Sequence, residues 1–122
     1  MEQNKYIPGD WVKYIGNNSL KYVQIWQVRE NFLFLESGYG IVNFSEVEPI
    51  PLTPEILEKN GWEWDGQDFV IEALVLYPEA DYFVFDGFGL KLKYVHQLQH
   101  LLYGLGIDFD FNLEDNYENN QV

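Results

Sequence analysis

The sequence predicts an α+β protein in which an N-terminal SH3-like small β-barrel is followed by a small α+β lobe. Three observations predict it. Residues 6–50 hold short strand-forming runs separated by turns, residues 47–64 form a proline-rich joint leading into a short helix, and apolar residues recur at helical spacing after residue 94. The chain has 122 residues, of which 47% are hydrophobic and 18% aromatic, enough to fill one compact domain or two small lobes.

The first lobe, residues 1–50, reads as five short strands. Turn residues precede or separate the runs WVKYI, YVQIWQV, FLFLE, IVNF and VEPI, and Ser45-Glu46 forms a single tight turn before the last run. Five strands in about 45 residues are typical of a small SH3-like barrel. Such barrels carry many unrelated functions, so this pattern predicts a fold without an activity.

The joint predicts a short, rigidly capped helix. Thr53 followed by Pro54 is a strong helix start, because the threonine hydroxyl can accept a free N–H of the first turn and proline lacks an N–H there. Leu52 stands at the spacing that packs on Leu57 across the helix start. The pair Asn60-Gly61 tolerates left-handed backbone angles, so we expect the helix to end there.

The second lobe, residues 51–112, is predicted to contain a β-hairpin, one main helix and a C-terminal strand. The hairpin pairs residues 69–77 with 82–85, and Gly106 ends the helix, with Ile107 folding back on Leu102. The apolar face of the helix is expected to hold Val95, Leu98, Leu101, Leu102 and Leu105. Ile107, Phe109 and Phe111 then alternate with Asp108 and Asp110, which predicts the strand, and residues 113–122 are expected to form a mobile acidic tail.

Composition also indicates a compartment. The chain has no cysteine, so disulfides and thiolate metal sites are excluded. No apolar run approaches the roughly 20 residues that cross a membrane. We therefore expect a cytoplasmic protein with no membrane partner and no cofactor.

Three sets of residues could carry chemistry or recognition. His96 and His100 are four apart on a helix, the spacing by which two imidazoles hold one zinc ion, but Gln97 stands where a zinc protease needs its glutamate. Polar surface or packing is favoured over metal binding for this pair, and we assign the two rings to the polar surface. Four oxygen-bearing side chains alternate as at the start of a calcium loop: Asp108, Asp110, Asn112 and Glu114. Leu113 stands where that loop needs glycine, and Asn119 stands where it needs its final glutamate.

The four tryptophans could form a ligand cage, but core packing is favoured for them; they are Trp11, Trp26, Trp62 and Trp64.

The distribution of charge is more informative. Residues 1–50 hold six acids against four bases, a net charge of −2, whereas residues 51–122 hold fourteen acids against three, a net charge of −11. A surface of this sign repels nucleic acid and anionic membranes and attracts a basic protein. The acids expected to bind such a partner are Glu63, Asp65, Asp68, Glu72, Glu79, Asp81, Asp86, Asp108 and Asp110. The competing interpretation is that the charge only maintains solubility.

Two literal strings carry a resemblance. The run EVEPIPLTPEILEKNGWEW, together with KYVHQLQHLLYGLGI, resembles a family of small uncharacterised proteins from phages, prophages and mobile elements of Bacteroidetes. In that family a GDWV-type barrel segment, a PLTPEILEKNG joint and a YVHQLQHLL helix recur in this order, and the match covers residues 8–107. The resemblance implies a mobile-element accessory protein in a bacterial cytoplasm, and it implies no activity.

Two hypotheses from different classes follow. The first is a non-enzymatic protein-interaction module whose acidic surface binds a basic host or phage protein, with mimicry of nucleic acid as one form of it. The alternative is a small metal-dependent hydrolase built on His96 and His100 with a nearby carboxylate.

Overall fold

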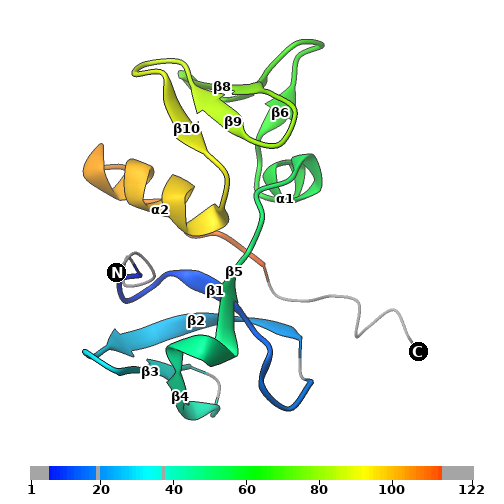
Figure 1. Cartoon of the computed structure of the whole chain (residues 1–122). Coiled ribbons are helices and arrows are strands. Elements are labelled where there is room, and N and C mark those ends of the chain that lie inside the picture. Colours follow the sequence, from blue (N-terminus) through cyan, green and yellow to red (C-terminus); the bar gives the residue numbers. More distant parts are fainter. Residues whose placement is uncertain (1–5, 19, 37, 114–122) are drawn as a thin grey trace. The chain divides into compact units, whose positions relative to one another are not determined.

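The computed structural model describes residues 6–18, 20–36 and 38–113 (Figure 1). The chain divides into two compact units, each with one antiparallel sheet. The first unit takes in the chain up to Ile50 together with Leu113, and the second is Pro51–Asn112. The α+β class is confirmed, since the two sheets are accompanied by one main helix.

The first unit contains a five-stranded sheet in the order β4-β3-β2-β1-β5. Its strands are β1 (Trp11–Tyr14), β2 (Lys21–Val28), β3 (Phe32–Leu35), β4 (Gly40–Asn43) and β5 (Val47–Pro49). Short 3₁₀ helices at Gly16–Asn18 and Phe44–Glu46 make two of the connections, the second being the tight turn that the sequence predicted before the last strand. The start of the second 3₁₀ helix is fixed by the Glu46 carboxylate, which accepts the Asn43 N–H at 2.9 Å.

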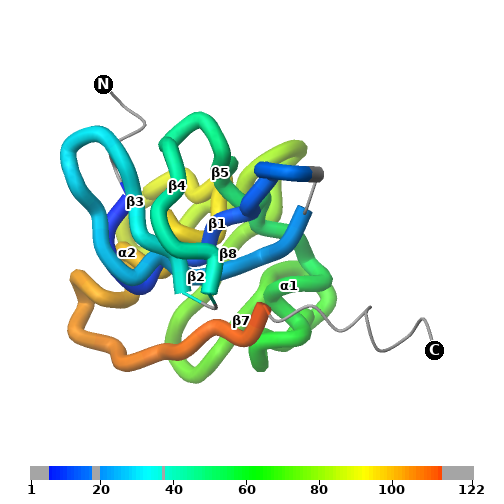
Figure 2. Tube along the Cα trace, turned by 90° about the horizontal axis from the view of Figure 1, so that it is seen from below, coloured from blue at the N-terminus to red at the C-terminus, as the bar shows by residue number. Residues whose placement is uncertain are grey.

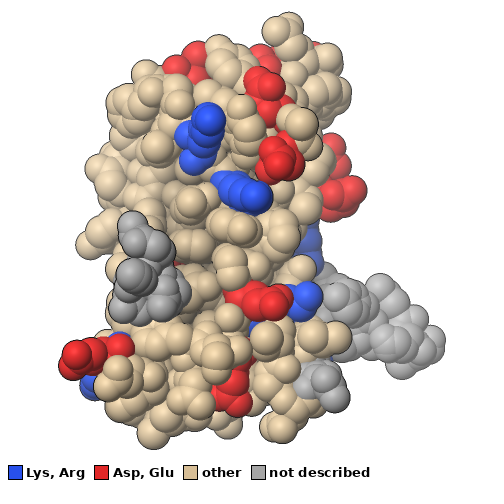
Figure 3. Space-filling model, viewed as in Figure 1, with Lys and Arg blue, Asp and Glu red and all other residues tan. Residues whose placement is uncertain are grey.

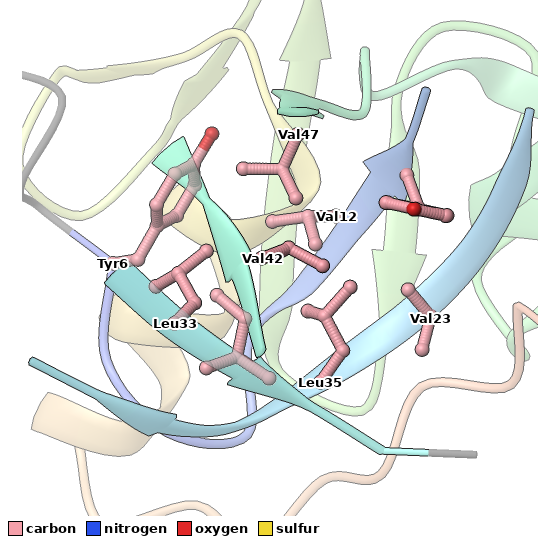
Figure 4. Packing of buried hydrophobic residues seen from close by; sticks show 9 residues of the cluster. Tyr6, Val12, Val23, Leu33, Leu35, Val42 and Val47 are labelled. Carbon is pink, nitrogen blue, oxygen red and sulfur yellow. The ribbon is translucent and has the colours of Figure 1, made fainter. Parts of the chain in front are cut away.

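The core of this unit lies on one face of the sheet (Figure 4). Its buried members are Tyr6, Val12, Tyr14, Val23, Ile25, Leu33, Leu35, Val42 and Val47. β4 and β5 are the two edges of the sheet, and no ladder joins them among the described residues. The sheet is thus open, and the predicted SH3-like closed barrel is not confirmed.

The helix of the joint forms as predicted. α1 (Pro54–Lys59) is capped by Thr53, whose hydroxyl accepts the Ile56 N–H at 3.2 Å. The helix ends at Asn60-Gly61, where Gly61 has φ of +94°. The N–H of Trp62 then donates to Leu57 at 3.0 Å, which satisfies a carbonyl of the last turn.

The sheet of the second unit has more strands than the predicted hairpin. Its order is β10-β9-β8-β7-β6, a simple meander. The strands are β6 (Glu63–Trp64), β7 (Phe69–Ile71), β8 (Leu74–Pro78), β9 (Phe83–Phe85) and β10 (Leu90–Leu92). The run 69–77, predicted as one strand, breaks into β7 and β8 at a two-residue turn, Glu72-Ala73, where Glu72 adopts the left-handed φ of +52°. The buried residues of the sheet are Phe69, Leu76, Phe83, Phe85 and Leu92.

The main helix, α2 (Val95–Gly104), forms as predicted apart from one residue of its apolar face. The residues predicted for that face are buried except Leu105, which is exposed because it caps the helix end. Gly106 has φ of +77°, and the Ile107 N–H donates to the Leu102 carbonyl at 2.9 Å, closing the predicted cap.

The predicted C-terminal strand does not form. Residues 107–113 are extended but pair with no strand of the described chain, and Figure 2 shows them as an orange-to-red segment ending beside α1. Burial does alternate: Phe111 is buried, whereas Asp108 and Asp110 are exposed. Leu113, predicted as the start of the tail, is buried with 3% of its surface exposed, and the rest of the predicted tail lies outside the described residues. Within the described part of the chain, no helix has the length and apolar character needed to span a bilayer.

Candidate functional site

The acids predicted to bind a partner gather on the turns of the second unit's sheet. Eight of the nine are exposed and Asp68 is half-buried. Glu63 lies in β6, Glu72 in the β7–β8 turn, and Asp108 and Asp110 in the extended segment. The others occupy the β6–β7, β8–β9 and β9–β10 connections: Asp65, Asp68, Glu79, Asp81 and Asp86. The meander therefore presents carboxylates at the ends of its strands.

The β6–β7 turn is held by Asp65. Its Oδ1 accepts the N–H groups of Gln67 at 2.9 Å and Asp68 at 2.8 Å. Gly66, with φ of +101°, lets the chain reverse between them. Because the N–H groups of Asp68 and Gln67 favour the charged carboxylate, they lower the pKa of Asp65. Asp65 thus has a structural role in addition to its charge.

Asp68 is the carboxyl group that this surface destabilises most clearly. Burial raises its pKa above the ordinary value, and repulsion from Asp65 and Asp86 raises it further. Asp86 in turn accepts the hydroxyl of Tyr77, and this hydrogen bond raises the pKa of Tyr77. The carboxylates of two neighbouring connections therefore repel one another within the folded unit.

Few bases offset these acids. The second unit contains only Lys59, Lys91 and Lys93 as basic residues. The Lys91 ammonium lies 5.2 Å from the centre of the Tyr82 ring and that of Lys93 lies 5.9 Å from the Tyr94 ring. On the face seen in Figure 3, the carboxylates stand singly or in small groups, with neutral and some basic side chains between them. On this face they do not merge into one continuous patch.

The two histidines of α2 are close together, but His96 is not polar surface. Their ring centres lie 5.5 Å apart, and His96 retains only 8% of its exposure, which corrects the assignment of both rings to the surface. His96 also stacks on Tyr94 at 6.0 Å. Among the described residues, no group of three or more His, Cys, Asp or Glu side chains could hold a metal ion.

Gln97, which stands where a zinc protease needs its glutamate, has a structural role at the start of α2. Its side-chain oxygen accepts the N–H groups of Lys93 at 2.7 Å and Tyr94 at 3.0 Å, so it caps the start of α2. The calcium-like segment is also tied into the fold, since the backbone of Asn112 is bound by the Asn60 side chain. Its predicted fourth ligand, Glu114, lies outside the described residues.

The tryptophans separate into buried and exposed pairs. Trp11 and Trp62 are buried, as core packing requires. Trp26 and Trp64 are 57% and 47% exposed, and each contacts a phenylalanine of its own unit. Residue type alone does not show which indole faces solvent, so the sequence did not distinguish these two pairs.

A second exposed surface, which the sequence analysis did not identify, lies on the outer side of the first unit's sheet. The Trp26 ring packs edge-on against Phe34 at 5.8 Å, and Phe34 packs edge-on against Phe32 at 5.6 Å. Ile41, the partner of Phe34 in the ladder, is 61% exposed. We call these four residues the aromatic face; Trp26 and Ile41 are exposed, and Phe32 and Phe34 are half-buried.

Comparison with family models, with curated proteins and with solved structures finds no match to this chain.

Proposed function

We propose that this chain is a non-enzymatic protein-interaction module whose second unit presents carboxylates to a basic protein. The observation that supports it best is the set of exposed carboxylates on the connections of the meander, among which Asp65 and Asp86 repel Asp68 and add to the effect of burial in raising its pKa. A partner carrying lysine and arginine would relieve this repulsion on binding, whereas nucleic acid or an anionic membrane would add to it. From the resemblance to mobile-element proteins, we propose further that this partner belongs to a bacterial host or its phage.

The topology of the first unit supports a finer proposal for its fold. Four strands form a meander, a 3₁₀ helix follows, and β5 returns to pair with β1. On the basis of this connectivity, we propose that the first unit is an SH3-like scaffold. Such a scaffold would carry a binding surface without supplying chemistry of its own.

The test compares two variants that lose equal charge. In one, Glu72, Glu79 and Asp81 of the second unit are replaced by glutamine or asparagine. In the matched control, Glu30, Glu36 and Glu48 of the first unit become glutamine; all six are exposed. After the partner is captured from the native host, its association rate with each variant is measured at two salt concentrations.

The proposal requires a steep salt dependence and a slower association for the second-unit variant alone, because exposed charges about 10 Å apart are screened at 0.1 M salt. Equal effects of the two variants, or no salt dependence, would leave the acidity a role in solubility only.

If the captured protein binds nucleic acid, and an oligonucleotide competes with the second unit for that protein, the proposal of nucleic-acid mimicry is supported. Metal analysis of protein purified without a histidine tag tests the hydrolase alternative, which requires stoichiometric zinc that disappears in the His96→Ala, His100→Ala double variant.

A further inference from the structure

The aromatic face results from the way β2 and β3 pair. In β3, Phe32 and Phe34 alternate with Leu33 and Leu35, and the two leucines belong to the core. The phenylalanines must therefore point to the opposite side of the sheet. Ile41, opposite Phe34 in β4, shares that side.

Trp26 lies on this side as well, because it directly follows the core residue Ile25 in β2, and a bulge in the β2–β3 pairing falls at the same place. The β2–β3 register runs from Ile25 opposite Leu35 directly to Gln27 opposite Phe34, so Trp26 is the extra residue between them. An extra residue in one strand bends it and re-aims the side chain it carries. Trp26 lies against the edge of Phe34 while more than half of its surface stays exposed.

This side of the sheet carries apolar side chains that do not belong to the unit's own core. The unit's core already fills the opposite side, and β4 is an edge strand with no further described strand beside it. Clustered exposed aromatic and aliphatic side chains are typical of a binding surface, and tryptophan is among the residues that most often dominate binding energy.

Charge selects the occupant. A second copy of the chain and a nucleic acid would each bring negative charge to a protein with a formal charge of −13, whereas a basic protein would be attracted. A base stands at the face itself: the Arg29 guanidinium lies 5.4 Å from the centre of the Phe34 ring and donates to the neutral Gln27 side chain, so it keeps its positive charge. The face therefore suits an apolar side chain of the partner, and the partner's bases would pair with carboxylates elsewhere on the chain.

We propose that the aromatic face binds an apolar side chain presented by a basic protein segment. The inference rests on the proposed function for the sign of the partner's charge. The two surfaces then act differently: the carboxylates accelerate encounter, and the aromatic face, where water is displaced, slows dissociation.

The test uses two synthetic heptapeptides with the same number of arginines, one alternating arginine with leucine and the other alternating arginine with glycine. The protein is the full chain carrying Trp64→Phe, so that Trp26 is the one exposed tryptophan of the described residues. The leucine peptide should shift the Trp26 emission to shorter wavelength and bind at least about tenfold more tightly than the glycine peptide.

Three variants decide the outcome. Trp26→Ala and, independently, Ile41→Thr should each remove most of the preference for leucine; both positions are so exposed that folding should be retained, which thermal unfolding checks. Trp64→Ala in the otherwise unchanged chain is the matched control and should leave the preference intact. Equal affinity for the two peptides, or a preference that survives Trp26→Ala, overturns the proposal.

Other occupants have their own signatures. A dimer found by sedimentation that dissociates in Trp26→Ala would assign the face to a second copy, and tighter binding of a ten-residue oligothymidylate would assign it to nucleic acid; either result overturns the proposal. If the second-unit charge variant slows association of both peptides while Trp26→Ala leaves dissociation unchanged, the proposed function survives and this inference fails. If instead Trp26→Ala speeds dissociation while the second-unit charge variant leaves association unchanged, the inference about the aromatic face survives and the proposed function of the acidic surface fails.

Discussion

Replacing Asn60 with alanine should release the extended segment that follows α2. The Asn60 side chain accepts the Asn112 N–H at 2.5 Å and donates to the carbonyls of Ile56 at 2.9 Å and Asn112 at 3.3 Å. Each such bond contributes about 0.5–1.5 kcal/mol net, and the Asn112 pair is exposed, so the sum lies toward the lower end of the range. We expect Asn60→Ala to lower the free energy of unfolding by about 1–3 kcal/mol.

The assay is urea titration followed by tryptophan fluorescence, together with amide hydrogen exchange at Asn112. Asn31→Ala is the matched control, since Asn31 is an exposed asparagine of the first unit. Asn60→Asp separates the two parts of the contact, because a carboxylate can still accept the Asn112 N–H but cannot donate to either carbonyl. If Asn60→Ala costs no more than Asn31→Ala, and exchange at Asn112 is unchanged, the contact does not hold the segment and the reasoning is refuted.

Leu98→Ala should lower the free energy of unfolding by about 2–5 kcal/mol, because Leu98 is fully buried, against about 1 kcal/mol for Thr53→Ala, which removes the α1 cap; the reverse order in denaturant titration would place the core elsewhere. Glu72→Asn should raise the melting temperature, since asparagine adopts the left-handed φ of +52° at lower cost than glutamate, and a fall would contradict this backbone assignment. Asp68→Asn should stabilise the protein at neutral pH. The pKa of Asp68 is raised above 3.8 on folding, so the folded state binds the proton more tightly than the unfolded state does. As the pH rises from 3.8 through the folded pKa, the charge on Asp68 therefore lowers the free energy of unfolding. Thermal unfolding across pH should show the gain vanishing toward pH 3, and a gain independent of pH would exclude the charge as its cause.

Features with a local cause were predictable from the sequence. The Thr53 hydroxyl needs only the N–H of Ile56, and Gly61 and Gly106 needed only a helix end beside them. Each interaction spans a few residues, so the order of residue types was enough to predict it. The same holds for the tight turn at residues 44–46, which the Glu46 carboxylate closes.

Features that depend on a distant partner were not predictable. Residues 107–111 alternate as a strand should, but a strand also needs a neighbouring edge, and here the Asn112 N–H is taken by the side chain of Asn60. The break at Glu72 was missed because no glycine, proline or asparagine marks that turn. His96 was assigned to the surface from its polar ring alone, although a ring stacked on Tyr94 can be buried.

The two candidate surfaces differed in predictability for a physical reason. Charge is carried by residue type and almost always lies outside, so the acids of the second unit could be named directly from the sequence. Apolar residues occupy both sides of β3, and alternation cannot tell which side becomes the core. Only the packing of the folded unit shows that Leu33 and Leu35 join the core, while Phe32 and Phe34 lie half-buried on the other side of the sheet. A sheet that is apolar on both sides leaves one side for something other than its own core, and we propose that a basic protein covers it because acids are in excess in this chain.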